Sequence, residues 1–104
     1  MIQVIATIEL KPDCRDDYLK ILRENVPKVK AEDGCLAYEP TIDIESGLPI
    51  KSEIRDNVVT IVEAWETLEA LHAHLKTGHM AAYREAVQDY VAGLSVRVLK
   101  PVYL

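Results

Sequence analysis

The order of hydrophobic patterns along this 104-residue sequence predicts an α+β fold of the ferredoxin-like, split βαβ kind, with a four-stranded antiparallel sheet. Segments of strand-like alternation and of helical periodicity follow one another as β-α-β-β-α-α-β. The length is typical of one domain and leaves no room for a second core, so residues 1–104 are expected to form a single domain.

The first quarter of the chain predicts a strand and then a long helix. Residues 2–10 alternate, so that every second side chain, beginning with Ile2, shares one face. Residues 13–32 carry apolar side chains at helical spacing, and Pro12 suits the start of that helix. Pro27 lies inside the segment and should bend the helix or end its regular part early.

Two strands and a loop are predicted next. Gly34 closes the helical segment as a cap or turn. Residues 35–44 indicate a second strand, in which Pro40 favours a sheet edge or a bulge. A polar loop follows over 45–56, and 57–66 is the third strand.

The last third predicts two helices and a final strand. Thr67 is a good N-cap for a short helix over 67–76, which Gly78 breaks. One side of that helix collects Leu68, Leu71 and Leu75. A second helix is expected from about 79 to 91, ended by Gly93. Residues 94–104 then form the last strand and an apolar tail.

The third strand also predicts a homodimer. It is apolar on both faces, because Val59, Ile61 and Trp65 alternate with Val58, Val62 and Ala64. A sheet covered by helices on one side only should carry polar residues on the other side. A twin subunit is the economical cover for the second face, with two sheets packed face to face. The tail Val102–Leu104 is positioned to cross onto that partner.

Composition excludes several classes of partner. A formal charge of −5 without a basic cluster argues against nucleic-acid binding. Apolar runs are too short to span a membrane, and the N-terminus lacks the features of a signal peptide, so a cytoplasmic protein is expected. In that compartment Cys14 and Cys35 should be free thiols, and the predicted helix would hold them about 30 Å apart, too far for a disulfide.

The stretch HAHLKTGHM, residues 72–80, contains all three histidines. His72 and His74 point about 200° apart around a helix, so they cannot chelate one ion together. His74 and His79 are separated by the break at Gly78, and no cysteine or carboxylate cluster completes a coordination shell. We therefore expect no metal.

His79, at the start of the last helix, has two interpretations. It is either a histidine bonded to backbone, or a neutral imidazole at a pocket rim, able to accept a proton because the helix N-terminus disfavours its protonation.

Three further side chains are polar groups on apolar elements. Asn25 lies on the apolar stripe of the first helix, where it needs a backbone partner or a ligand. Trp65 is either a core residue or an N–H donor. Glu63, inside an apolar strand, must find a hydrogen bond, a cation or a ligand, and Arg97 is a candidate neutralising partner. Tyr38 joins this set more weakly.

These residues stand in a pattern that resembles a known family. GCLAYEP (34–40), IVEAWETLEALHAHLKTGHMAAYREAV (61–87) and VRVLKP (96–101) resemble the antibiotic biosynthesis monooxygenase superfamily, and especially its small bacterial quinol monooxygenases. The resemblance covers nearly the whole chain and specifies the fold better than the substrate. It implies a dimeric α+β barrel with a cavity between sheet and helices. It also implies oxidation of small electron-rich dihydroxy aromatics by O₂ without any cofactor.

The resemblance carries over four residues, Trp65, Asn25, His79 and His74. Together with the polar groups described above, this makes His79, Trp65 and Asn25 the expected catalytic residues, and substrate would be bound by His74, Tyr38, Glu63 and Tyr83. Haem-degrading relatives use an axial histidine in the last helix, where this chain has Tyr83 and Arg84, and a strand-one asparagine that is absent here. Haem is therefore not expected.

Two alternatives remain open beside the oxidation of quinols. Some relatives isomerise small phosphorylated carbonyl compounds, which would require at least two cationic groups in the pocket, from Arg55, Arg84 and Arg97. A dimer that binds small molecules without catalysis is the third hypothesis, and a filled core without a cavity near Trp65 would favour it.

Overall fold

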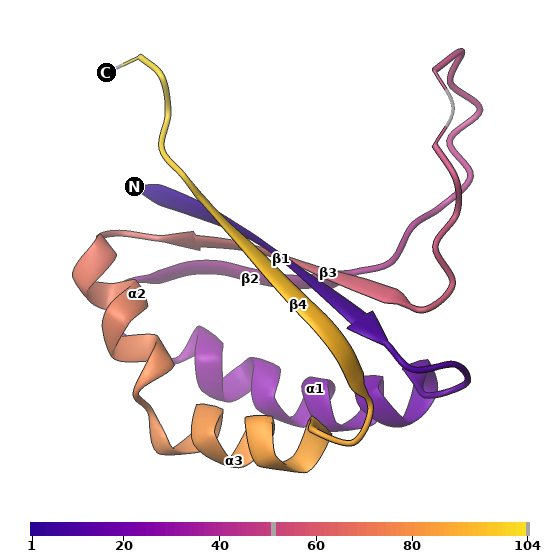
Figure 1. The fold of residues 1–104 in the computed structure, drawn as a ribbon. Coiled ribbons are helices and arrows are strands. Elements are labelled where there is room, and N and C mark those ends of the chain that lie inside the picture. The colour runs from indigo at the N-terminus through magenta and orange to yellow at the C-terminus, as the bar shows by residue number, and fades with distance from the viewer. Residues whose placement is uncertain (51, 104) are drawn as a thin grey trace.

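The structure is a computed structural model that describes residues 1–50 and 52–103. The elements follow in the order β1 (Ile2–Leu10), α1 (Arg15–Lys30), β2 (Cys35–Thr41), β3 (Val58–Trp65), α2 (Leu68–Leu75), α3 (Gly78–Val87) and β4 (Val91–Leu99). The strands form one antiparallel sheet in the order β2-β3-β1-β4. Figure 1 shows the helices together on one side of this sheet. The predicted α+β, ferredoxin-like fold is confirmed.

The sheet turns one apolar face to the helices. In β1 the buried side chains are Val4, Ala6, Ile8 and Leu10, which is the predicted alternation. In β3 Val59, Ile61 and Trp65 are buried on the same side. These side chains and the buried stripe of α1 form one core, because removing this apolar surface from water is the main favourable term in folding.

The helix α1 continues through Pro27 to Lys30, so the expectation of an early end is wrong. The next turn depends on Gly34, whose φ of +82° favours a residue without a side chain. A Cβ atom added there would lie 2.6 Å from the Cβ of Ala70 in α2. The turn is therefore both left-handed and packed tightly against α2.

Strand β2 lies at a sheet edge, as Pro40 indicated, but it ends at Thr41, three residues before the predicted limit. Residues 42–50 and 52–57 form a long arm between β2 and β3, which extends well beyond the sheet in Figure 1. Within it, the Arg55 guanidinium is paired with the Asp43 carboxylate, at 2.8 Å from Nε to Oδ2.

The predicted boundary between the last helix and the last strand is wrong. Helix α3 ends at Val87 and β4 begins at Val91, so Gly93 lies inside the strand. A Cβ atom at Gly93 would lie 2.6 Å from a carboxylate oxygen of Glu9, the end of an exposed side chain that can move aside.

Helix α2 is rotated relative to its predicted face. Thr67 caps it as expected, accepting a hydrogen bond from the Ala70 amide. Leu71 and His74 are buried, however, whereas Leu68 and Leu75 are half exposed. Thr77 lies in the turn between α2 and α3 and caps the N-terminus of α3, where its side chain accepts a hydrogen bond from the Met80 amide. Within the described part of the chain, no helix is long and apolar enough to cross a membrane.

Candidate functional site

A cavity of about 560 Å³ lies between the helix-facing side of the sheet and the helices α2 and α3. Most of its wall is apolar and comes from β1, β3, β4 and the two helices. The polar residues on the wall are Tyr38, Glu63, His74, Tyr83, Arg84 and Gln88. An apolar cavity with a few polar groups is the usual form of a site for a small organic molecule.

The cavity opens along β4. This strand is an edge strand, and its helix-facing side chains Leu94, Val96 and Val98 are 66%, 51% and 49% exposed. They pair in register with the buried β1 residues Ile8, Ala6 and Val4. The apolar surface therefore continues from the core out to solvent along β4.

The structure divides the predicted site residues into two groups. His74, Tyr38, Glu63 and Tyr83, expected to bind substrate, all line the cavity. The expected catalytic residues His79, Trp65 and Asn25 do not line it and stand behind its wall.

Glu63 is a buried carboxyl group on the cavity wall. It projects from β3 toward the helices and is 6% exposed. The indole Nε1–H of Trp65, two residues along the strand, donates to its Oε1 at 2.9 Å. Burial raises the pKa of Glu63 to about 7. The hydrogen bond from Trp65 lowers this pKa, and the negative charge of Glu32 raises it further. A carboxyl group of this kind can exchange a proton near neutral pH.

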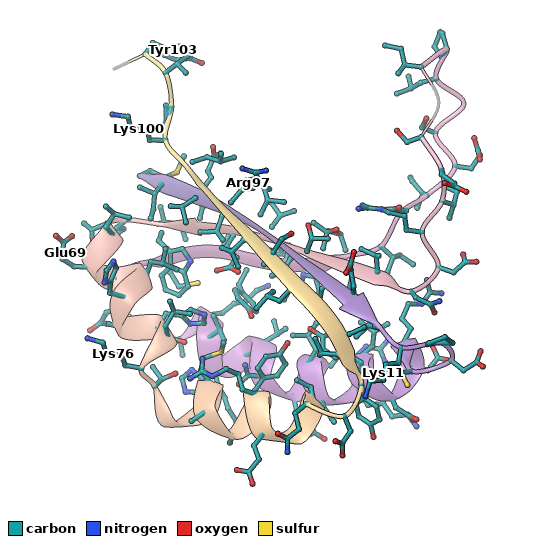
Figure 2. All side chains as sticks on the ribbon, in the orientation of Figure 1. Lys11, Glu69, Lys76, Arg97, Lys100 and Tyr103 are labelled. Atoms are coloured by element: carbon teal, nitrogen blue, oxygen red, sulfur yellow. The ribbon has the colours of Figure 1, made fainter. Side chains whose placement is uncertain are left out.

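Arg97 is not the partner of Glu63. It pairs in register with Ile5, on the face of the sheet that points away from the helices. Figure 2 shows its side chain on that outer side. Glu63 lies in the row of Val4 and Val98 on the inner face, so the expected ion pair is wrong and the indole takes its place.

The imidazole of His74 is held on three sides. The centroid of its ring lies 4.7 Å from that of the Trp65 ring and 5.7 Å from that of the Tyr38 ring, which it meets edge-on. Its Nδ1 lies 3.1 and 3.0 Å from the two carboxylate oxygens of Glu32, which follows the end of α1. His74 is 2% exposed, so its orientation is fixed by packing and by one carboxylate.

His79 meets the same carboxylate. Its Nε2 lies 2.7 Å from Oε2 of Glu32. The break near Gly78 was expected to separate His74 from His79, and the structure corrects this, because Glu32 joins both rings. A carboxylate accepts hydrogen bonds and donates none, so each ring turns an N–H toward it.

The tyrosines of the site are neutral hydrogen-bonding groups. The hydroxyls of Tyr83 and Tyr18 lie 2.5 Å apart, which links α3 to α1. Burial raises the pKa of Tyr18, Tyr38 and Tyr83. These hydroxyls can orient a ligand but are poor proton acceptors at neutral pH.

Asn25 has a contact of a different kind. Its Nδ2 donates to the sulfur of Met80 at 3.3 Å, deep between α1 and α3. Met80 itself lines the cavity. Asn25 thus supports a wall residue and does not itself line the cavity.

Three polar atoms on the wall are left for a ligand. Among the described residues, no buried side-chain nitrogen or oxygen lacks a hydrogen-bond partner. The Nε2 of His74, the Oε2 of Glu63 and the hydroxyl of Tyr38 bond to no described residue, so these atoms are open to the cavity and not sealed in the core.

Cations and metal ligands are sparse in this site. Of the described arginines and lysines, Arg84 alone lines the cavity, and it donates to the Leu75 carbonyl at 3.0 Å. No three histidine, cysteine or acidic side chains of residues 1–50 and 52–103 are arranged to hold a metal ion. Cys14 and Cys35 are free thiols, as predicted.

No sequence pattern pointed to Glu32. It lies in a polar turn after α1, far in sequence from both histidines, and its charge is ordinary for a helix end. Its closeness to them follows from packing of the turn against α2. The sequence does not reveal how closely the turn at Gly34 packs against α2, where a Cβ atom added to Gly34 would lie 2.6 Å from the Cβ of Ala70.

Comparison with known proteins assigns the fold to a family. The family model described as antibiotic biosynthesis monooxygenase matches residues 1–86. The protein named "Probable quinol monooxygenase YgiN" from Escherichia coli K12 is 39% identical over 103 residues, covering 97% of this chain and 98% of its own.

Solved structures agree on the fold. PA3566 from Pseudomonas aeruginosa has a TM-score of 0.81 at 23% identity, covering 97% of this chain and 93% of its own. Rv0793 from Mycobacterium tuberculosis has a TM-score of 0.81 at 24% identity, covering 99% and 96%. The family match over residues 1–86 and the 39% identity to the Escherichia coli protein show that the chain belongs to the antibiotic biosynthesis monooxygenase family.

Proposed function

We propose that this protein is a cofactor-independent monooxygenase that oxidises a small electron-rich dihydroxy aromatic, a quinol, with O₂. Family membership supports the reaction class, and the name of the Escherichia coli relative supports the substrate class. The observation that carries the proposal is the buried carboxyl group of Glu63, open on one oxygen to an apolar cavity of about 560 Å³.

The reaction can proceed without a cofactor because the substrate supplies the electrons. Loss of a phenolic proton gives an anion that can pass an electron to O₂. Monooxygenation then converts a quinol and O₂ into a hydroxyquinone and water, and the oxidase outcome gives a quinone and hydrogen peroxide. Both outcomes balance without a further reductant. The protein must bind the ring, accept a proton and exclude water.

The residue roles follow from what lines the cavity. Glu63 would accept the phenolic proton, since its pKa of about 7 suits proton transfer at neutral pH. His74, Tyr38 and Tyr83 would hold the substrate hydroxyls. Trp65 would position Glu63 through its indole N–H.

His79 and Asn25 would act indirectly. His79 was the first candidate for the base, but its position behind the wall favours a role in holding Glu32. Asn25 would support the wall through Met80.

The alternatives find less support. An isomerase for a phosphorylated compound needs two cations, yet Arg55 is paired with Asp43 in the arm and Arg97 lies on the outer face of the sheet. Arg84 is the one predicted cation on the cavity wall. A purely binding dimer was expected to have a filled core, whereas a cavity exists beside the ring of His74 that Trp65 packs against.

We also infer a homodimer. The outer face of the sheet carries Val62 at 41% and Leu99 at 44% exposure, and the arm carries Ile44 at 75%. In the tail Val102 is 94% exposed, while Leu104 lies outside the described residues. Apolar surface of this extent marks an interaction site, and a second copy would cover it. A cytoplasmic location stays a prediction.

Oxygen uptake with a reduced menadiol panel, in chelator-treated buffer, tests the proposed function. We expect uptake well above autoxidation, with loss of about a hundredfold in Glu63→Gln and no loss in the control Glu24→Gln, which lies exposed on α1. Adding catalase after the reaction distinguishes the two outcomes, because it releases O₂ from hydrogen peroxide but releases none if the products are a hydroxyquinone and water. Uptake equal to autoxidation across the panel would rule out quinols as substrates.

A further inference from the structure

The carboxylate of Glu32 lies between the rings of His74 and His79, and of these two rings only His74 lines the cavity. Its Oε2 lies 3.0 Å from Nδ1 of His74 and 2.7 Å from Nε2 of His79, and its Oε1 lies 3.1 Å from Nδ1 of His74. The Glu32 side chain is 12% exposed, so the carboxylate is largely withdrawn from water. The two rings thus approach it through different nitrogens.

This difference fixes the two rings in opposite tautomers. A neutral imidazole has one N–H donor and one lone pair, and the nitrogen that faces a carboxylate must carry the hydrogen. His74 therefore carries its hydrogen on Nδ1, and His79 carries its hydrogen on Nε2. The Nε2 of His74, which bonds to no described residue, is left as a lone-pair acceptor on the cavity wall.

The ring of His74 cannot easily turn to reverse this arrangement. Trp65 lies against one of its faces at 4.7 Å, and Tyr38 meets it edge-on at 5.7 Å. Thr77 also donates to the His74 carbonyl at 3.0 Å, which secures the backbone at the end of α2. A ring flip would give up the Glu32 contact in a place that admits little water.

We propose that Glu32 is a positioning residue that keeps Nε2 of His74 as a hydrogen-bond acceptor, so that the cavity selects hydroxyl-bearing aromatics over the matching quinones and ethers. The selection of hydroxyl-bearing ligands rests on the proposed function, whereas the tautomer of His74 is independent of it. Beside His74, the carboxylate form of Glu63 is also an acceptor. A quinol offers two donors to this pair, whereas a hydroxyquinone product offers one and a quinone product offers none, so either product is held less tightly than the substrate.

Nuclear magnetic resonance measures the tautomers directly. Two-bond ¹H–¹⁵N correlations on the labelled protein at pH 8 distinguish Nδ1–H from Nε2–H for each ring. We expect Nδ1–H for His74, Nε2–H for His79, and an averaged pattern for the exposed His72, which serves as internal reference. Signals are assigned with single His→Gln variants. An Nε2–H tautomer at His74 would overturn the proposal.

Variants of Glu32 test its part in the arrangement. Glu32→Ala should release His74 from the fixed tautomer, whereas Glu24→Ala, exposed on α1, should change neither ring. If Glu32→Ala fails to fold, Glu32→Leu replaces it, because a leucine side chain fills similar space and has no oxygen that could accept a hydrogen bond from either ring. Unchanged spectra would remove Glu32 as the determinant.

Ligand selection is measured by anaerobic titration, followed by the fluorescence of Trp65, the single tryptophan. The probes are 1,3-dihydroxynaphthalene, which donates, and 1,3-dimethoxynaphthalene, which only accepts. We expect the wild type to bind the diol about tenfold or more tightly than the dimethoxy compound. In Glu32→Ala the logarithm of this ratio of dissociation constants should fall by at least a third. Comparing the two proteins cancels the size difference of the probes.

The outcomes separate the two proposals. Equal preference in the wild type and Glu32→Ala would overturn the selection by Glu32 while leaving the diol site in place. Expected tautomers without binding of either naphthalene would support the positioning by Glu32 and count against an aromatic substrate.

Discussion

Glu63 is a carboxyl group whose surroundings oppose its ionisation, and this has a consequence for activity. If it accepts the phenolic proton, its ionised form is the active one. Because its pKa is about 7, turnover of a quinol by the wild type should rise with pH to a midpoint near that value and level off above it. The measurement is initial oxygen uptake against pH, corrected for autoxidation at each pH.

Trp65→Phe provides the control for this profile. The variant removes the N–H donor to Glu63 and with it stabilisation of the carboxylate. The midpoint should move about one pH unit higher, as expected for one hydrogen bond to a charged group. A midpoint that stays in place would contradict the role of the indole.

The same carboxyl group should make stability depend on pH. Its folded pKa of about 7 lies above the ordinary value of 4.5, so between these values the folded state holds a proton that the unfolded state has lost. The free energy of unfolding therefore falls as pH rises through this window. The shift corresponds to about 3 kcal/mol at pH 8.

Glu63→Gln should lack this loss. Urea denaturation of both proteins at pH 4.5 and pH 8 measures it, and the variant should gain on the wild type as pH rises. Parallel changes in the two proteins would show that Glu63 does not cause the dependence. A variant that is stabler at pH 8 and less active would indicate a group kept for chemistry at a cost in stability.

At the scale of single residues, sequence reasoning found part of the site. Glu63 was identifiable because a carboxylate in an apolar strand must have a reason to be there. Its partner was not identifiable, since whether Arg97 or Trp65 reaches it depends on which face each residue takes. Glu32 could not be identified because the contacts that define it join residues 42 and 47 positions apart.

At the scale of elements, the turn between α1 and β2 offers a test of packing. Gly34→Ala would place a methyl group in a left-handed conformation and 2.6 Å from the Ala70 side chain. Gly47 has a similar φ of +72° but nothing within 4 Å, so Gly47→Ala bears the backbone strain alone. The strain costs about 1 kcal/mol, and Gly34→Ala should cost at least about 2 kcal/mol more.

Thermal unfolding of the two variants measures the difference. If Gly34→Ala were no less stable than Gly47→Ala, helix α2 would move to make room for the methyl group without loss of folding stability. A large difference would identify the turn as a rigid support for Glu32, which lies two residues before Gly34.

Element types were predictable from periodicity, but their ends were not. The apolar stripe of α1 and the alternation of β1 appear directly in the buried residues. The end of α3 was missed because Tyr90 and Val91 continue the apolar spacing of a helix, although in the structure β4 begins at Val91. The face of α2 was missed because three leucines suggested the core side, while His74 occupies it through contacts with Trp65, Tyr38 and Glu32.

At the scale of the whole molecule, the outer face of the sheet predicts self-association. Figure 1 shows the arm and the C-terminal tail extending away from the helices, on the side where a second sheet would lie. Val62→Lys places a charge in the middle of that face and should convert the dimer to a monomer. Leu68→Lys, on the comparably exposed surface of α2, should leave the dimer unchanged.

Sedimentation velocity of the wild type and both variants measures this. A wild type that sediments as a monomer at micromolar concentration would contradict the homodimer outright. Dissociation by Leu68→Lys but not Val62→Lys would place the interface on the helices instead of the sheet.

The carboxylate of Glu32 also bears on how a ligand comes and goes. Because His74 belongs to α2 and His79 to α3, moving either helix outward breaks a bond to the same carboxylate. Parting these helices is therefore costly, whereas the half-exposed side chains of β4 can yield with little loss. An aromatic should enter and leave across β4, so that substitutions in this strand alter association and dissociation rates while the oxidation step keeps its speed.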